Sequence, residues 1–68
     1  MIDARGLSCP MPVVMVQRAL KESPDGVTVI VDNMAAVGNI GRYAANYGYT
    51  LEDAQNGAEH TLTLKKKG

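Results

Sequence analysis

The spacing of hydrophobic residues changes along the chain, and these changes predict the order of the elements. Over the first third, apolar residues recur at helical spacing with polar residues on the opposite side, the apolar set being Val13, Val16, Ala19 and Leu20. Pro12 suits a first helical turn, and Pro24 forces Ser23 out of the α region. The pattern predicts an amphipathic helix from about Pro10 to Glu22.

The next segment is β-branched throughout, which is typical of a strand. Val27, Val29 and Val31 fall on one face and Thr28 and Ile30 on the other, so we expect a central strand that is apolar on both sides. Asp32 or Asn33 would cap a second helix, and Gly48 would end it in the left-handed conformation. The apolar stripe expected for this helix is Val37, Ile40, Ala44 and Tyr47.

The last part of the chain has the pattern of a β-hairpin. Asn56-Gly57 is the preferred pair for a two-residue type I′ turn. Counting from this turn places Asp53 opposite His60, pairs Leu51 with Leu62 and pairs Tyr49 with Leu64, which gives the hairpin one apolar face.

With Met1 to Ala4 as a short opening strand, the order is strand, helix, strand, helix, hairpin. Right-handed crossovers place both helices on one side of a mixed four-stranded sheet. We therefore predict an α/β two-layer sandwich that spans residues 1–68 as a single domain. A chain of 68 residues buries only about 60% of its unfolded surface and cannot support two cores.

Charge and hydropathy exclude several classes of function. Seven basic and seven acidic side chains cancel, so binding of a nucleic acid or an anionic membrane would need a local patch. The candidate patch is Lys65-Lys66-Lys67, which we interpret as a solvated tail. No apolar stretch approaches the roughly 20 residues of a membrane span. The start of the sequence lacks the pattern of a secretory signal, so we expect a cytoplasmic protein.

The chain contains one cysteine, Cys9, and one histidine, His60. This excludes an internal disulfide, and we expect no metal site. No base lies near Cys9 in the sequence, and His60 is expected to pair with Asp53, so a Cys-His hydrolytic site is not expected. The remaining chemistry for a single thiolate is exchange with disulfides or persulfides.

Cys9 lies in a segment bracketed by glycine and proline, directly before the first predicted helix. A thiolate there would face free N–H groups and the positive end of the helix dipole, both of which lower the pKa of the thiol. Arg5 would add positive charge if it points towards the sulfur. The alternative is a buried cysteine that acts as a small hydrophobic residue. The loop position favours the reactive interpretation.

The run Cys9-Pro10-Met11-Pro12, after Asp3-Ala4-Arg5-Gly6-Leu7, resembles the TusA/SirA-like family of sulfur-carrier proteins, whose signature is Cys-Pro-x-Pro after a D-x-R-G-L-type lead. The resemblance covers essentially the whole chain. It implies a β-α-β-α-β-β order, a sheet with strand order 1-2-4-3 and both helices on one face. It also implies that Cys9 carries a persulfide within an active loop made of Arg5, Gly6, Ser8, Pro10, Met11 and Pro12.

The second predicted helix resembles the YedF-like branch of this family, because Asp32-Asn33 is followed by Asn39-Ile40-Gly41-Arg42. TusA itself more typically has Asp-Pro at the first of these positions. The resemblance implies supporting roles for Asn33, Asn39 and Arg42, with helix capping or an exposed helical face as the alternative. YedF-like proteins commonly carry a second domain of the DsrE type, so this chain is a stand-alone relative or an excerpt.

The leading hypothesis is a sulfurtransferase-like carrier. It would accept sulfur on Cys9 from a donor protein such as a cysteine desulfurase and relay it to an acceptor protein, as a monomer and without a cofactor. The sulfur would serve tRNA thiolation, molybdenum-cofactor synthesis, or selenium and sulfur metabolism. The alternative is a non-enzymatic regulatory or protein-interaction module of the same fold. Direct nucleic-acid binding is not expected at zero net charge.

Overall fold

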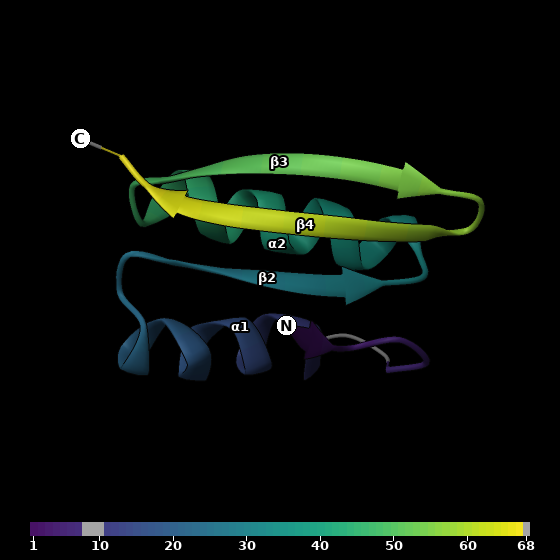
Figure 1. Ribbon diagram of the computed structural model, residues 1–68, viewed down its shortest axis with the longest axis horizontal. Coiled ribbons are helices and arrows are strands. Elements are labelled where there is room, and N and C mark those ends of the chain that lie inside the picture. The colour runs from purple at the N-terminus through teal and green to yellow at the C-terminus, as the bar shows by residue number, and fades with distance from the viewer. Residues whose placement is uncertain (8–10, 68) are drawn as a thin grey trace.

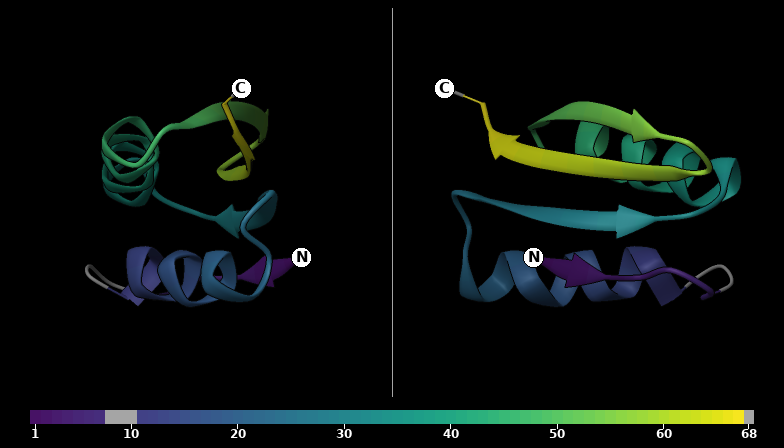
Figure 2. Two further views of the ribbon diagram at one scale, coloured as in Figure 1. Left: turned by 90° about the vertical axis from the view of Figure 1, so that its left-hand side faces the viewer. Right: turned by 45° about the vertical axis from the view of Figure 1, so that its right-hand side comes forward.

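The computed structural model describes residues 1–7 and 11–67. Figure 1 shows the elements in chain order: β1 (Ile2–Asp3), α1 (Met11–Glu22), β2 (Gly26–Val31), α2 (Met34–Asn46), β3 (Tyr49–Asn56) and β4 (Glu59–Lys66). The sheet has the order β1-β2-β4-β3, with β1 parallel to β2 and the other neighbours antiparallel. Both helices cover one face of it, as the end-on view in Figure 2 shows. The predicted two-layer architecture and strand order are confirmed.

A single aliphatic core lies between the helices and the sheet. Alternate residues of the central strands and residues one turn apart on the helices point into it, as the two periodicities require. Burying each large aliphatic side chain contributes about 1.5–3 kcal/mol relative to leaving it exposed. The buried hydrophobic residues are Ala4, Val16, Leu20, Val29, Val31, Ala36, Ile40, Ala44, Leu62 and Leu64.

Two sequence-based expectations about burial are wrong. Tyr47 is 63% exposed, because α2 ends at Asn46 and the backbone of Tyr47 (φ −112°, ψ 14°) leaves the helical stripe. The buried residues of α2 are Ala36, Ile40 and Ala44, and Val37 is half-buried. The outer face of β2, with Thr28 and Ile30, is only half-buried, because both helices cover the other side.

The hairpin turn lies one position later than predicted. β3 continues through Asn56, and the loop is Gly57-Ala58. A type I′ turn at Asn56-Gly57 needs a positive φ at both residues. Gly57 has one (φ 64°), but Asn56 does not, since only glycines have a positive φ among the described residues. A positive φ at the first loop residue alone fits a type II′ turn.

The predicted pairing of the hairpin is therefore wrong by two residues. Leu51 lies opposite Leu64, and His60 lies opposite Gln55. Because a shift of two residues preserves the side-chain alternation, the expected apolar residues still share the core face.

The C-terminal lysines also differ from expectation. Lys65 and Lys66 belong to β4, and the backbone N–H of Lys67 donates to the Gly48 carbonyl at 3.0 Å. The backbone of these lysines is thus held in the sheet, and the interpretation as a tail is wrong. Their side chains are exposed, as expected of solvated residues. In the described part of the chain, no helix has the length and apolar character needed to cross a membrane.

Gly26 provides a test of the register between β2 and β4. Its φ is +154°, and a Cβ there would lie 2.3 Å from the Leu64 carbonyl oxygen. We expect Gly26→Ala to lower the free energy of unfolding by about 2 kcal/mol or more. Gly38→Ala is the matched control, because a Cβ there would meet nothing within 4 Å, and it should stabilise α2 by about 0.5–1 kcal/mol. Urea unfolding measures both. A Gly26→Ala protein of parental stability would contradict this register.

Candidate functional site

The predicted site lies at one end of the molecule. β2 ends at Val31, and α1 and α2 begin at Met11 and Met34, so the carboxyl end of the strand and both helix N-termini share this end (Figure 1, right-hand side). The predicted site residues Ser8, Cys9 and Pro10 lie outside the described residues. The residues on either side of this segment define the frame to which Cys9 is attached.

The start of α1 is anchored in the core and carries no compensating negative charge. Pro12 is fully buried, whereas Met11 is 44% exposed. The first turn of α1 contains no acidic side chain. The partial positive charge of the free N–H groups is therefore not offset by a carboxylate of this turn, which is the condition that favours a nearby thiolate.

A hydrogen bond ties the loop before α1 to the end of β2. The backbone N–H of Gly6, a residue with φ +74°, donates to Oδ2 of Asp32 at 3.0 Å. Asn33 then caps α2, because its side-chain oxygen accepts from the Ala36 N–H at 2.7 Å. The cap predicted for Asn33 is confirmed, and Asp32 is left to hold the loop.

Sequence reasoning considered Asp32 only as a helix cap and missed its contact with the loop. The position of Asp32 in the sequence could have predicted this contact. A carboxylate that directly follows a central strand lies at the sheet end to which the neighbouring parallel strand also leads. Because β1 runs parallel to β2, the loop after β1 returns to this end.

Arg5 is held by two carboxylates. Its Nε and Nη2 donate to Oδ1 and Oδ2 of Asp3 at 2.9 Å each, and its Nη1 donates to Oε2 of Glu59 at 3.0 Å. These hydrogen bonds lower the pKa of Asp3 to about 2 and raise the pKa of Arg5. Arg5 thus links β1 to β4 across β2. The predicted electrostatic support of Cys9 by Arg5 stays a prediction, and two anions partly offset the charge that it could supply.

The remaining predicted residues lie on α2. The guanidinium Nη2 of Arg42 donates to the side-chain oxygen of Asn39, three residues earlier on the helix. Arg42 is exposed and Asn39 is half-buried. This pair is a local contact on the helix surface, and the supporting roles of Asn39 and Arg42 stay predictions.

His60 has a structural partner. It is 5% exposed, and its Nδ1 lies 2.9 and 3.1 Å from the two carboxylate oxygens of Asp53. The expected contact is present, although Asp53 lies diagonally across the hairpin, opposite Leu62. Among residues 1–7 and 11–67, no three His, Cys, Asp or Glu side chains are grouped as metal ligands.

Comparison with known proteins decides the family. The family described as sulfurtransferase TusA matches residues 1–66. The chain belongs to the TusA family. A protein of Methanocaldococcus jannaschii with the provisional name of sulfur carrier protein is 40% identical over 68 residues, which cover 97% of this chain and 91% of the relative. The crystal structure of a SirA-like protein from Desulfitobacterium hafniense has a TM-score of 0.85 at 32% identity and covers 98% of this chain and 96% of that chain.

The resemblance read from the sequence is thereby confirmed at the level of the TusA family and of its fold. The assignment to the YedF-like branch stays a prediction. The range of the TusA family match, residues 1–66, includes Cys9, the only cysteine of the chain.

The Asp3–Arg5 pair gives a pH prediction. The pKa of Asp3 is about 2, below the ordinary 3.8. The charged form is favoured in the folded state, so the stabilisation is present above pH 3.8 and is lost as the pH falls through about 2. In an NMR titration of the Asp3 carboxyl carbon, Arg5→Gln should move the midpoint back towards 3.8. Arg18→Gln, a change at an exposed arginine of α1, should leave it unchanged. The same low midpoint in Arg5→Gln would contradict the assignment.

Proposed function

We propose that this TusA-family protein accepts sulfane sulfur on Cys9 as a persulfide and relays it to an acceptor protein. The observation that carries the proposal is the match to the sulfurtransferase family over residues 1–66, a range that contains the only thiol of the chain. The donor is a cysteine desulfurase or a similar protein. The carrier acts as a monomer in the cytoplasm, in tRNA thiolation, molybdenum-cofactor synthesis, or selenium and sulfur metabolism.

The transfer consists of two exchanges of one S–S bond for another. In the first, the Cys9 thiolate attacks the terminal sulfur of the donor persulfide, R–S–SH. The donor S–S bond breaks, the donor leaves as a thiolate, and Cys9–S–SH is formed. In the second, an acceptor thiolate attacks the terminal sulfur on Cys9 and releases the Cys9 thiolate. Bonds and electrons balance in each exchange, so no external oxidant or reductant is consumed.

The start of α1 supports this chemistry. The thiolate is the nucleophile in the first exchange and the leaving group in the second, and a lowered pKa favours the ionised form in both roles. The first turn of α1 has free N–H groups and no acidic side chain, and Cys9 is two residues before Met11, where the helix begins.

Asp32 supports the site as a positioning residue. Its bond to the Gly6 N–H fixes the chain before Cys9, and Pro12 fixes the chain after it. A loop restrained on both sides presents its thiol with a smaller loss of conformational entropy when a partner docks. Asp32 acts through Gly6 and not on the sulfur.

Sulfur loading tests the proposal directly. Incubation with a cysteine desulfurase, pyridoxal phosphate and cysteine should add the mass of one sulfur atom to the protein in an intact-mass spectrum, because Cys9 accepts the persulfide sulfur. The added mass should disappear on reduction and should be absent in Cys9→Ser. If the parent protein gains no such mass from desulfurases of several classes, the carrier function is wrong.

Asp32 variants test the positioning role. In Asp32→Ala the Gly6 N–H loses its acceptor, and we expect the rate of sulfur transfer to Cys9 to fall about tenfold, because a mobile loop presents the thiol less often in the reactive geometry. Asp32→Asn keeps a side-chain oxygen and should retain most of the rate. Asp25→Ala removes an exposed carboxylate at the opposite end of the molecule and is the matched control. Equal rates for Asp32→Ala and the parent would contradict the role.

A further inference from the structure

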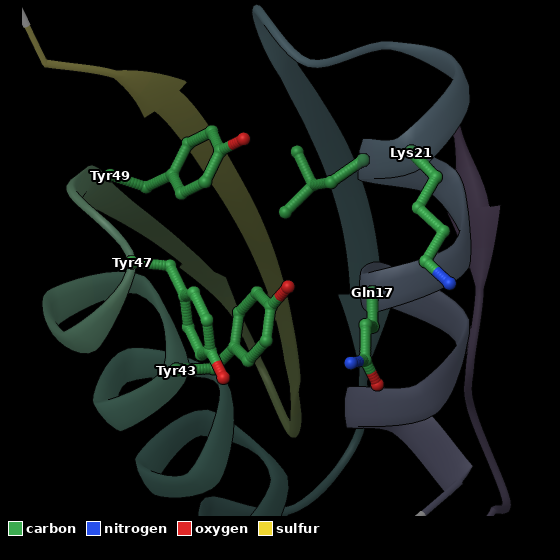
Figure 3. A pocket seen from close by; sticks show the side chains of 6 residues that line it. Gln17, Lys21, Tyr43, Tyr47 and Tyr49 are labelled. Atoms are coloured by element: carbon green, nitrogen blue, oxygen red, sulfur yellow. The ribbon is translucent and has the colours of Figure 1, made fainter.

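All the aromatic residues of the chain line one groove. The sequence contains three tyrosines and neither tryptophan nor phenylalanine. The groove has a volume of about 310 Å³ and is lined by Gln17, Leu20, Lys21, Tyr43, Tyr47 and Tyr49. Figure 3 shows the tyrosine rings, which come from the end of α2 and the start of β3, facing Gln17 and Lys21 of α1. This end of the molecule is opposite to the one with the helix N-termini, so sulfur transfer on Cys9 does not account for the groove.

Two of the rings, Tyr43 and Tyr49, pack against the edge of the core, and the third, Tyr47, extends this aromatic surface into the solvent. Tyr43 and Tyr47 are stacked with centroids 4.5 Å apart and an interplanar angle of 30°. Tyr47 nevertheless leaves 63% of its surface in water. The Tyr49 hydroxyl donates to the Pro24 carbonyl at 3.0 Å, which fixes that ring at the edge of the groove. An exposed ring that is backed by a second, partly buried ring is a preformed platform for another flat ring.

Positive charge gathers at the same end. Lys66 lies directly opposite Tyr49 in the hairpin, so its side chain leaves the sheet on the face of the groove. Lys65 pairs with Gly26 at the start of β2 and points to the other face of the sheet, because side chains alternate along β4. The backbone N–H of Lys67 donates to the Gly48 carbonyl at the same end. Together with Lys21, four lysines lie at this end among the described residues, compared with two carboxylates, those of Glu22 and Asp25.

The opposite end has the reverse balance. Its charged residues are Asp3, Arg5, Asp32, Asp53 and Glu59, and Arg5 is bound to two of the carboxylates. The zero net charge of the chain therefore conceals a basic end and an acidic end. On the face of the tyrosine groove this basic end presents Lys21 and Lys66.

We propose that the groove binds single-stranded nucleic acid, with one base stacked on the tyrosines and the adjoining phosphates next to Lys21 and Lys66. Base stacking on aromatic side chains together with basic residues along the backbone is the common mode of single-strand binding. The Gln17 amide supplies a donor and an acceptor for a base edge.

An acidic peptide would need the lysines but not three rings in one groove, so the stacked tyrosines favour a nucleic acid over a peptide. A duplex is also disfavoured, because its bases are already stacked on each other and its grooves present edges rather than faces. The volume of the groove is at the lower limit of the roughly 300–1,000 Å³ typical of small-molecule sites, which suits a single nucleotide unit.

The test uses Cys9→Ser protein, so the result does not depend on sulfur transfer. Fluorescence anisotropy with a fluorescein-labelled RNA of eight adenosines should show binding at low salt, and a duplex of equal length should bind more weakly. Raising the salt from 50 to 200 mM should weaken binding about sevenfold if two phosphates are contacted. No binding to the single strand at 50 mM salt would overturn the proposal.

Variants separate stacking from charge. Tyr47→Ser should lower the affinity about tenfold, and Tyr47→Phe should retain it, because the ring and not the hydroxyl stacks. Lys21→Gln should weaken binding and reduce its salt dependence by about one phosphate. Met34→Ser is the matched control, because Met34 is 67% exposed at the start of α2, the end of that helix far from Tyr47, and it should leave binding unchanged.

Two outcomes of this series would overturn the proposal. The first is an equal loss of affinity in Tyr47→Ser and Met34→Ser, because the effect would then not come from the groove. The second is equally tight binding of a polyglutamate peptide of matched charge that is insensitive to Tyr47→Ser, which would make the basic end a docking surface for an acidic protein. Circular dichroism of each variant verifies that the fold is kept.

Discussion

The antiparallel pairing of β2 with β4 is the interaction on which the rest of the structure depends. It aligns Val29 with Leu62 and Val27 with Leu64 in the middle of the sheet. The helices bury this surface through residues such as Val16 and Ile40, which are fully buried. Neither edge strand makes this surface alone, because β1 has two residues and β3 is largely exposed. Once β2 and β4 are paired, the helices have one apolar face to cover.

The same pairing determines where the chemistry lies. β2 ends at Val31, so Asp32 reaches the loop that follows the parallel strand β1, and Asn33 starts α2 beside it. At this end Arg5 links β1 to β4 through a bidentate contact with Asp3 and a single contact with Glu59. Exposed ion pairs contribute little to stability because water screens them, so this network acts more on the geometry of β1 than on the stability of the fold. The segment that carries Cys9 therefore leaves a fixed strand end and enters a fixed helix.

Local patterns in the sequence predicted what local physics determines. The helical stripe around Val16, the β-branched run of β2 and the cap at Asn33 each follow from neighbours in the chain, and the structure has all three. The predictions failed where the structure depends on pairing between strands that are distant in the sequence. The preference of Asn56-Gly57 for a turn did not prevail, since β4 is held in register by β2 as well as by β3. Lys65 and Lys66, taken for part of a tail, are strand residues for the same reason.

The candidate site shows the same division. The Cys-Pro-x-Pro run and the start of the helix could be read from the sequence, but Glu59, a partner of Arg5, is 54 positions away along the chain. The tyrosine groove could not be predicted from the sequence either, because Tyr49 of β3 faces residues of α1 that lie about thirty positions before it in the chain. Contacts of this kind depend on the sheet order and cannot be derived from spacing.

The central claim is that Cys9 is an activated thiolate, and the measurement that tests it most directly is the pKa of that thiol. The rate of alkylation by iodoacetamide against pH gives this value, first for the folded protein and then in denaturant. We expect a folded-state pKa well below the ordinary value of about 8.5, with a return to about 8.5 on unfolding. A folded-state pKa at or above 8.5 would contradict the claim and would leave Cys9 as an ordinary cysteine in an interaction module.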